Sequence, residues 1–133
     1  MKTSKKQPPI FAKIKARFPS ITDYTWGKGL IIAYGDTVYC KMRITPSNEI
    51  HEAVHLKQQA AIGVEVWWHK YLSDDKFRLE QEVEAYRAEF KWMDKNMDRN
   101  EAYRIKVFHI NNLCSPMYGG IMTKEDAWAI LDK

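Results

Sequence analysis

The amino-acid sequence predicts an α+β fold that is mostly helical, with one small β-hairpin ahead of a series of helices. Two short runs of strand-forming residues, Leu30–Tyr34 and Thr37–Met42, flank the turn signal Gly35-Asp36, a pattern typical of a hairpin with a two-residue loop. After this hairpin, apolar residues recur at helical spacing and are interrupted by residues that commonly cap helices. The length of 133 residues, with 45% hydrophobic and 29% charged residues, favours one folded domain.

The amino-terminal residues differ in composition from the rest of the chain. Residues 1–9 contain three lysines and the pair Pro8-Pro9, so we predict that they form a flexible basic tail. Residues 10–133 are then the single domain. This domain is predicted to begin with a short amphipathic helix over residues 10–18, which Pro19 ends.

The helices after the hairpin are predicted from their start and stop signals. Thr45 is a typical N-cap and Pro46 is typical of the first helical position, so a helix is expected from Pro46 to about Ala61. Gly63 separates this helix from the next. Further helices are predicted at residues 64–72, 74–97, 100–113 and 123–131.

Charge and composition narrow the classes of partner. The net charge of +4 permits nucleic-acid binding, but no recognised RNA-binding or zinc-finger motif is present, so we do not expect a nucleic-acid partner. No apolar run approaches the roughly 18 residues of a membrane span, and no signal-peptide pattern follows the first residues. The two cysteines are too sparse for a disulfide framework. These features predict a cytoplasmic protein without a membrane partner.

The segment His51-Glu52-Ala53-Val54-His55 carries the strongest chemical signal. On a helix, His51 and His55 lie one turn apart on the same face, where two imidazole nitrogens can share one Zn²⁺ ion. Glu52 is too far round the helix to be a simple third ligand. It can instead act as general base on a water that the metal activates, as in HExxH metalloproteases.

Catalytic zinc usually takes three protein ligands and a water, so a third ligand is needed. No histidine follows at the spacing of the metzincins. The next long helix contains Glu80, Glu82 and Glu84, which project about 100° apart per residue, so at most one of them can be well aimed.

These motifs together resemble a known pattern. The HExxH segment, followed by Gln58 and then by Glu82-Val83-Glu84-Ala85-Tyr86, resembles the minimal gluzincin-like zinc metallopeptidases, short single-domain proteins of bacteria and phages. The loop Ser115–Gly119 is also similar to one found late in such chains. The resemblance implies a zincin-like fold, in which a small hairpin or sheet packs beside the HExxH helix and a glutamate helix.

The resemblance also implies roles for individual residues. His51 and His55 become zinc ligands, Glu52 the general base, and Glu82 the third ligand, with Glu84 as second choice. Thermolysin-like enzymes have an aspartate four residues after the glutamate ligand, where this chain has Tyr86. The candidates for orienting a ligand or stabilising an oxyanion are Gln58, Tyr86, His109 and Tyr118.

The sequence therefore predicts a zinc-dependent hydrolase, most simply a peptidase, with a peptide or protein substrate. In zincins an edge strand beside the active helix pairs with the substrate, and Thr37–Met42 or Lys41–Ile44 is expected in that role. Two alternatives stay open: a non-catalytic zinc-binding structural or regulatory protein, and a basic helical protein associated with nucleic acid. The substrate and the oligomeric state do not follow from the sequence.

Overall fold

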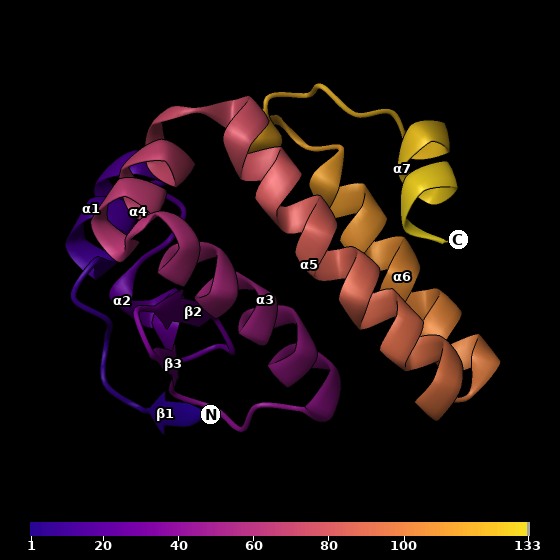
Figure 1. Ribbon diagram of the computed structural model, residues 1–133, viewed down its shortest axis with the longest axis horizontal. Helices are drawn as coiled ribbons and strands as arrows, with labels where there is room; N and C mark the ends of the chain where they lie inside the picture. The colour runs from indigo at the N-terminus through magenta and orange to yellow at the C-terminus, as the bar shows by residue number, and fades with distance from the viewer. Residues whose placement is uncertain (133) are drawn as a thin grey trace.

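A computed structural model describes residues 1–132 of the chain, so Lys133, the last residue of the predicted domain, lies outside the described residues. A small sheet and short helices come first, and longer helices follow (Figure 1). The first elements are β1 (Lys2–Ser4), α1 (Phe11–Arg17), α2 (Asp23–Trp26), β2 (Ile31–Tyr34) and β3 (Thr37–Cys40). The later elements are α3 (Pro46–Ile62), α4 (Val64–Ser73), α5 (Asp75–Asn96), α6 (Arg99–Leu113), the 3-10 helix η1 (Pro116–Tyr118) and α7 (Lys124–Leu131).

The predicted α+β, mostly helical fold is confirmed, and so are the hairpin and the helices that follow it. The predicted caps operate as expected: Thr45 accepts a hydrogen bond from the backbone of Asn48 and thereby begins α3. Gly63 has a φ of 97°, a value that favours glycine, and it separates α3 from α4. The short helix α2 was not predicted. No helix within residues 1–132 is both long enough and apolar enough to cross a membrane.

The sheet corrects two expectations. Its strand order is β1-β3-β2, with β1 parallel and β2 antiparallel to β3. Residues 2–4 are therefore an edge strand, and the prediction of a flexible tail is wrong for them, because the edge of β3 offers backbone partners that composition cannot reveal. The central position of β3 also means that Thr37–Cys40 has no free edge for a substrate, whereas no strand within residues 1–132 pairs with the outer edge of β2.

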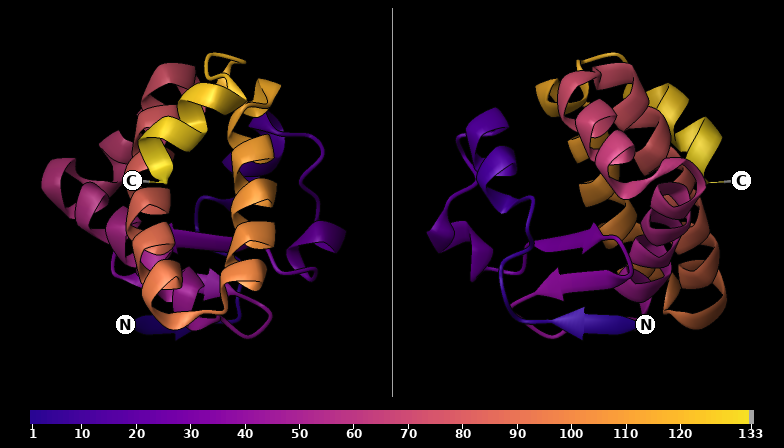
Figure 2. Two further views of the ribbon diagram at one scale, coloured as in Figure 1. Left: turned by 90° about the vertical axis from the view of Figure 1, so that its right-hand side faces the viewer. Right: turned by 60° about the vertical axis from the view of Figure 1, so that its left-hand side comes forward.

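Two clusters of buried hydrophobic residues form the core. One joins α1, α2 and β2 to α4, through residues such as Phe11, Trp26 and Trp67. The other joins α5, α6, η1 and α7, through residues such as Phe90 and Leu113. Figure 2 shows α5 and α6 running side by side, with α1 and α2 at the far end of the sheet from them. The packing of α3 against α5 connects the two halves.

The fully buried side chain of Arg78 ties three elements together. From α5 it donates hydrogen bonds to the carbonyl of Tyr71 at 2.6 Å and to the carbonyl of Met117 at 2.9 Å, and it pairs with Asp75. These bonds attach the end of α4 and the η1 segment to the start of α5. A buried charge of this kind stabilises a fold only while its partners remain in place.

We therefore expect Arg78→Met to lower the free energy of unfolding by about 2–4 kcal/mol, because one buried and one partly buried carbonyl lose their donors. The measurement is urea denaturation followed by circular dichroism. Arg87→Met is the control, since Arg87 lies on the same helix but is exposed, and its effect should stay within about 0.5 kcal/mol. Equal losses in the two variants would contradict this assignment.

Candidate metal centre

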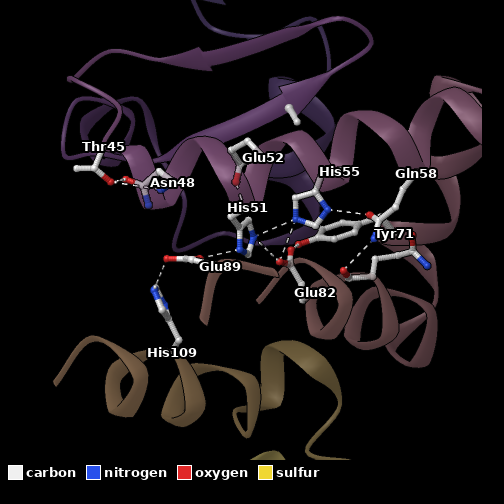
Figure 3. Close-up of polar contacts among 12 residues, drawn as sticks. Thr45, Asn48, His51, Glu52, His55, Gln58, Tyr71, Glu82, Glu89 and His109 are labelled. Atoms are coloured by element: carbon white, nitrogen blue, oxygen red, sulfur yellow. Dashed lines mark hydrogen bonds and ion pairs between the residues drawn. The ribbon is translucent and has the colours of Figure 1, made fainter. Parts of the chain in front are cut away.

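Three polar side chains of α3 are buried together. His51, Glu52 and His55 are 7%, 7% and 4% exposed, and each offers a ligand atom within 4.8 Å of the others. The helical spacing of four residues places both imidazoles on the same face of α3, as predicted, and Figure 3 shows both rings directed toward α5. Such a group could hold a metal ion.

The helix α5 adds Glu82 to this group. Its Oε1 atom lies 3.0 Å from Nε2 of His51 and 3.1 Å from Nε2 of His55, and the two Nε2 atoms lie 3.1 Å from each other. These three atoms form a nearly equilateral triangle (Figure 3). In tetrahedral zinc sites, bond lengths of ~2.0–2.1 Å separate neighbouring ligand atoms by ~3.3 Å. The triangle thus needs to expand only slightly to fit a tetrahedral metal ion.

On the side away from the triangle, each of these three side chains contacts another polar group. Nδ1 of His51 lies 3.0 Å from Oε1 of Glu89, and Nδ1 of His55 lies 2.8 Å from Oε1 of Gln58. The hydroxyl of Tyr71 donates to Oε2 of Glu82 at 2.6 Å. Because a carboxylate oxygen and an amide oxygen accept hydrogen bonds from the two Nδ1–H groups, the Nε2 lone pairs are free to face a metal.

The directions of the donor lone pairs decide whether a metal ion fits this site. With both Nδ1 atoms protonated, two nitrogen lone pairs and one carboxylate oxygen converge on a single point. Three acceptors this close repel one another unless a positive charge lies between them. Either protons or a metal cation can supply that charge, and the donor set of two imidazoles and one carboxylate suits a catalytic zinc ion.

When protons supply the positive charge between the three acceptors, they shift the pKa values of His51 and Glu82. Burial lowers the pKa of His51, but hydrogen bonds with Glu82 and Glu89 outweigh it and keep this pKa well above the ordinary histidine value. Burial raises the pKa of Glu82, but attraction to His55 and hydrogen bonds with both histidines keep it well below the ordinary range. A metal ion that binds here is expected to displace these protons.

Glu52 lies beside the triangle rather than within it. Its Oε2 atom is 3.7 Å from Nε2 of His51, an ion-pair distance that leaves the carboxylate without a hydrogen bond to that ring. Burial raises the pKa of Glu52, although the nearby charges of His51 and His55 partly offset this. A buried carboxylate with a raised pKa, next to a metal-type cluster, has the properties of a general base.

A cavity of about 570 Å³ opens over this cluster. The floor contains the two histidines, Glu52 and Glu82, and one wall comes from residues between Ser20 and Ala33. The lining also includes Phe108, His109 and Asn112 of α6. The cluster is therefore reachable by a molecule larger than water.

The structure separates the predicted residues that surround the cluster from those that do not. Glu82 faces the two histidines, whereas Glu84 is exposed and lies 3.3 Å from Nε2 of Gln58, which donates to it. Gln58 supports His55 and donates to the carbonyl of Gln81 at 3.1 Å. The Tyr86 ring packs edge-on against His51, with centroids 4.4 Å apart, and does not take the place of a supporting acid.

The other two predicted candidates lie further from the triangle. His109 has its Nε2 atom 3.4 Å from Oε2 of Glu89, so it supports the residue that supports His51. That Oε2 atom is buried and has no hydrogen-bond partner of good geometry among residues 1–132. Tyr118 is buried at the cavity wall.

Sequence reasoning missed Glu89 and Tyr71. Glu89 follows Glu82 by seven residues, two turns along α5 on the same face, so a search beyond the four-residue spacing of thermolysin-like enzymes would have found it. Tyr71 comes from α4, and no local spacing connects it to Glu82. Its role depends on how α4 packs.

The donor triangle predicts that the metal-free protein binds one Zn²⁺ per chain, as measured by isothermal titration calorimetry. Glu82→Gln should reduce the affinity by more than the ~10- to 100-fold loss that is typical of a supporting residue. Glu84→Gln is the matched control from the same helix and should leave the affinity unchanged. A larger loss for Glu84→Gln than for Glu82→Gln would contradict the assignment of Glu82.

The support of His51 by Glu89 gives a second expectation. Glu89→Gln removes the negative charge that orients the imidazole, so zinc affinity should fall by about 10- to 100-fold. Glu80→Gln, an exposed change on the same helix, serves as control. If Glu89→Gln binds zinc as tightly as the unchanged protein, Glu89 does not support the ligand.

No family model, curated protein or solved structure matches this chain at a significant level. The geometry of the cluster, together with the sequence motifs, is therefore the basis for a functional proposal.

Proposed function

We propose that this protein is a zinc-dependent hydrolase that cleaves peptide bonds. The observation that carries the proposal is the triangle of His51, His55 and Glu82, with the unbound carboxylate of Glu52 beside it at the floor of a cavity. Two histidines and a glutamate form the ligand set of thermolysin-type zinc enzymes. This support is consistent with the resemblance of the HExxH and glutamate helices to the gluzincin-like peptidases.

Zinc bound at this site supplies Lewis acidity, which lowers the pKa of water and polarises a carbonyl group. Glu52 is the chain's own acid–base group. Its carboxylate accepts the proton of a water at the cavity floor and later delivers that proton to the leaving amine. The raised pKa of Glu52, caused mainly by burial, brings its proton affinity closer to that of the groups with which it exchanges protons.

Tyrosine hydroxyls at the cavity wall are suited to stabilise developing negative charge. Burial raises the pKa of Tyr118 and, together with the charge of Glu82, raises the pKa of Tyr86 well above the ordinary value. Both phenols therefore stay protonated at neutral pH and can donate a hydrogen bond. His109 is less suited to this role, because its ring faces Glu89.

A peptide is the substrate class that the sheet favours. β2 is an edge strand, and its residues Ile31 to Ala33 line the same cavity as Glu52 and His55. An exposed strand edge binds an extended peptide through main-chain hydrogen bonds, which serve any sequence. The role that sequence analysis gave to the segments around β3 thus passes to β2, and this relation of edge strand, HExxH helix and glutamate helix supports a zincin-like fold.

Glu52→Gln should reduce cleavage of a mixed-sequence peptide library by about 10²- to 10⁴-fold, because the amide cannot accept a proton. Zinc content should stay at one ion per chain, as measured by atomic emission. The control is Glu49→Gln, an exposed change on the same helix, which should retain full activity.

Three results distinguish the proposals. Full activity of zinc-loaded Glu52→Gln would remove Glu52 from the chemistry. Tight zinc binding without cleavage of any peptide would favour the non-catalytic zinc protein. Failure to bind zinc, combined with salt-dependent DNA binding that survives His51→Ala, would favour the nucleic-acid alternative.

A further inference from the structure

The outer edge of β2 is available to a peptide along only part of its length. The carbonyl of Ala33 accepts hydrogen bonds from Nε2 of Gln59 at 2.8 Å and from Nε1 of Trp68 at 3.3 Å. The backbone N–H of Gly35 donates to Oε1 of Gln59 at 2.7 Å. The side-chain amide of Gln59, which is 1% exposed, therefore pairs with the end of β2 as the backbone of a neighbouring strand would.

The preceding part of the same edge is free. Residues two apart in an antiparallel pair direct their backbone groups to the same side, so Ile31 presents its N–H and C=O to the outer edge, as Ala33 does. Within residues 1–132, no hydrogen bond from outside the hairpin reaches these two groups of Ile31. Ile31 also lines the cavity. A peptide can thus pair with Ile31 but cannot continue past Ala33.

The distance from the candidate metal centre to Gln59, whose amide covers the end of β2, is short. Gln59 follows His55 by four residues on α3, which corresponds to an advance of about 6 Å along the helix. An extended peptide advances about 3.3 Å per residue. There is room for about two residues of substrate between the metal centre and Gln59.

The residues that line the cavity also differ between the covered and the free part of the β2 edge. Its lining includes each residue from Gly29 to Ala33 but neither Tyr34 nor Gln59. In the opposite direction it continues past Glu52 to Asn48, Lys28 and Thr25. Along α3 and β2, the lining therefore ends at His55 and Ala33 on the Gln59 side and reaches further on the other side.

We propose that Gln59 and Trp68 form the closed end of the substrate cleft, so that the enzyme removes one or two residues from the amino terminus of an extended peptide. This inference rests on the proposed peptidase function and adds the substrate class. A strand antiparallel to β2 forms both hydrogen bonds with Ile31 through a single peptide residue, whereas a parallel strand needs two peptide residues, one on each side of the position opposite Ile31. The shortness of the free edge therefore favours an antiparallel peptide. An antiparallel peptide has its amino terminus toward Gln59.

The test uses the zinc-loaded full chain and a library of synthetic peptides of uniform length and mixed sequence, with products identified by mass spectrometry. Cleavage is expected at the first or second peptide bond. The best peptide is then remade with two glycines added at its amino terminus, and kcat/KM at the original bond should fall at least about tenfold. The same two glycines added at the carboxyl terminus are the matched control and should have no such effect.

Cleavage spread along the peptides, or concentrated near their carboxyl termini, would overturn the closed-end inference while leaving the peptidase function intact. Absence of any cleavage by the zinc-loaded protein would overturn both. Two variants probe the cause. Gln59→Ala should move cleavage to the third and later bonds. Should that variant fail to fold, Ile31→Pro removes the outward N–H of Ile31 without breaking a hydrogen bond between β2 and β3, and it should raise KM about tenfold without changing zinc affinity.

Discussion

The structure depends on the packing of α3 against α5, which buries two histidines and three glutamates in one place. Buried ionisable groups destabilise a fold unless each finds a partner of opposite charge or a hydrogen bond. Here the partners are mutual: Glu82 faces both histidines, and Glu89 supports His51. The same pairing that makes this burial tolerable leaves three donor atoms aimed at one point, which is the requirement for binding a metal.

The elements around this pair of helices serve to hold the donor atoms in position. α4 contributes the hydroxyl of Tyr71 to Glu82, and α6 contributes His109 to Glu89. Arg78 in turn attaches α4 and the η1 segment to α5. Ligand orientation in metal sites depends on such supporting contacts. In this chain of 133 residues, those contacts come from four helices, α3, α4, α5 and α6.

The small sheet has a different task. Its strands are short, and its order leaves β2 at the edge nearest the cavity. Gln59 and Trp68 pair with one end of that edge and leave Ile31 open. An edge that is partly covered exposes fewer unpaired backbone groups, which reduces its tendency to pair with other chains. The uncovered part lines the same cavity as His51 and His55, so under the proposed function, protection of the sheet and selection of a substrate depend on the same residues.

The sequence by itself determined the hairpin, the boundaries of the later helices, and the placement of His51, Glu52 and His55 along one stretch of helix, because caps, turns and four-residue spacings act between neighbours in the chain. The sequence also narrowed the candidates for a third metal ligand to the glutamates of α5. Only the tertiary structure decided that Glu82 rather than Glu84 faces the histidines, that Glu89 contacts His51 and Tyr71 contacts Glu82, and that β1 makes β3 central. Each of these depends on the angle at which distant elements pack, and no local pattern encodes that angle.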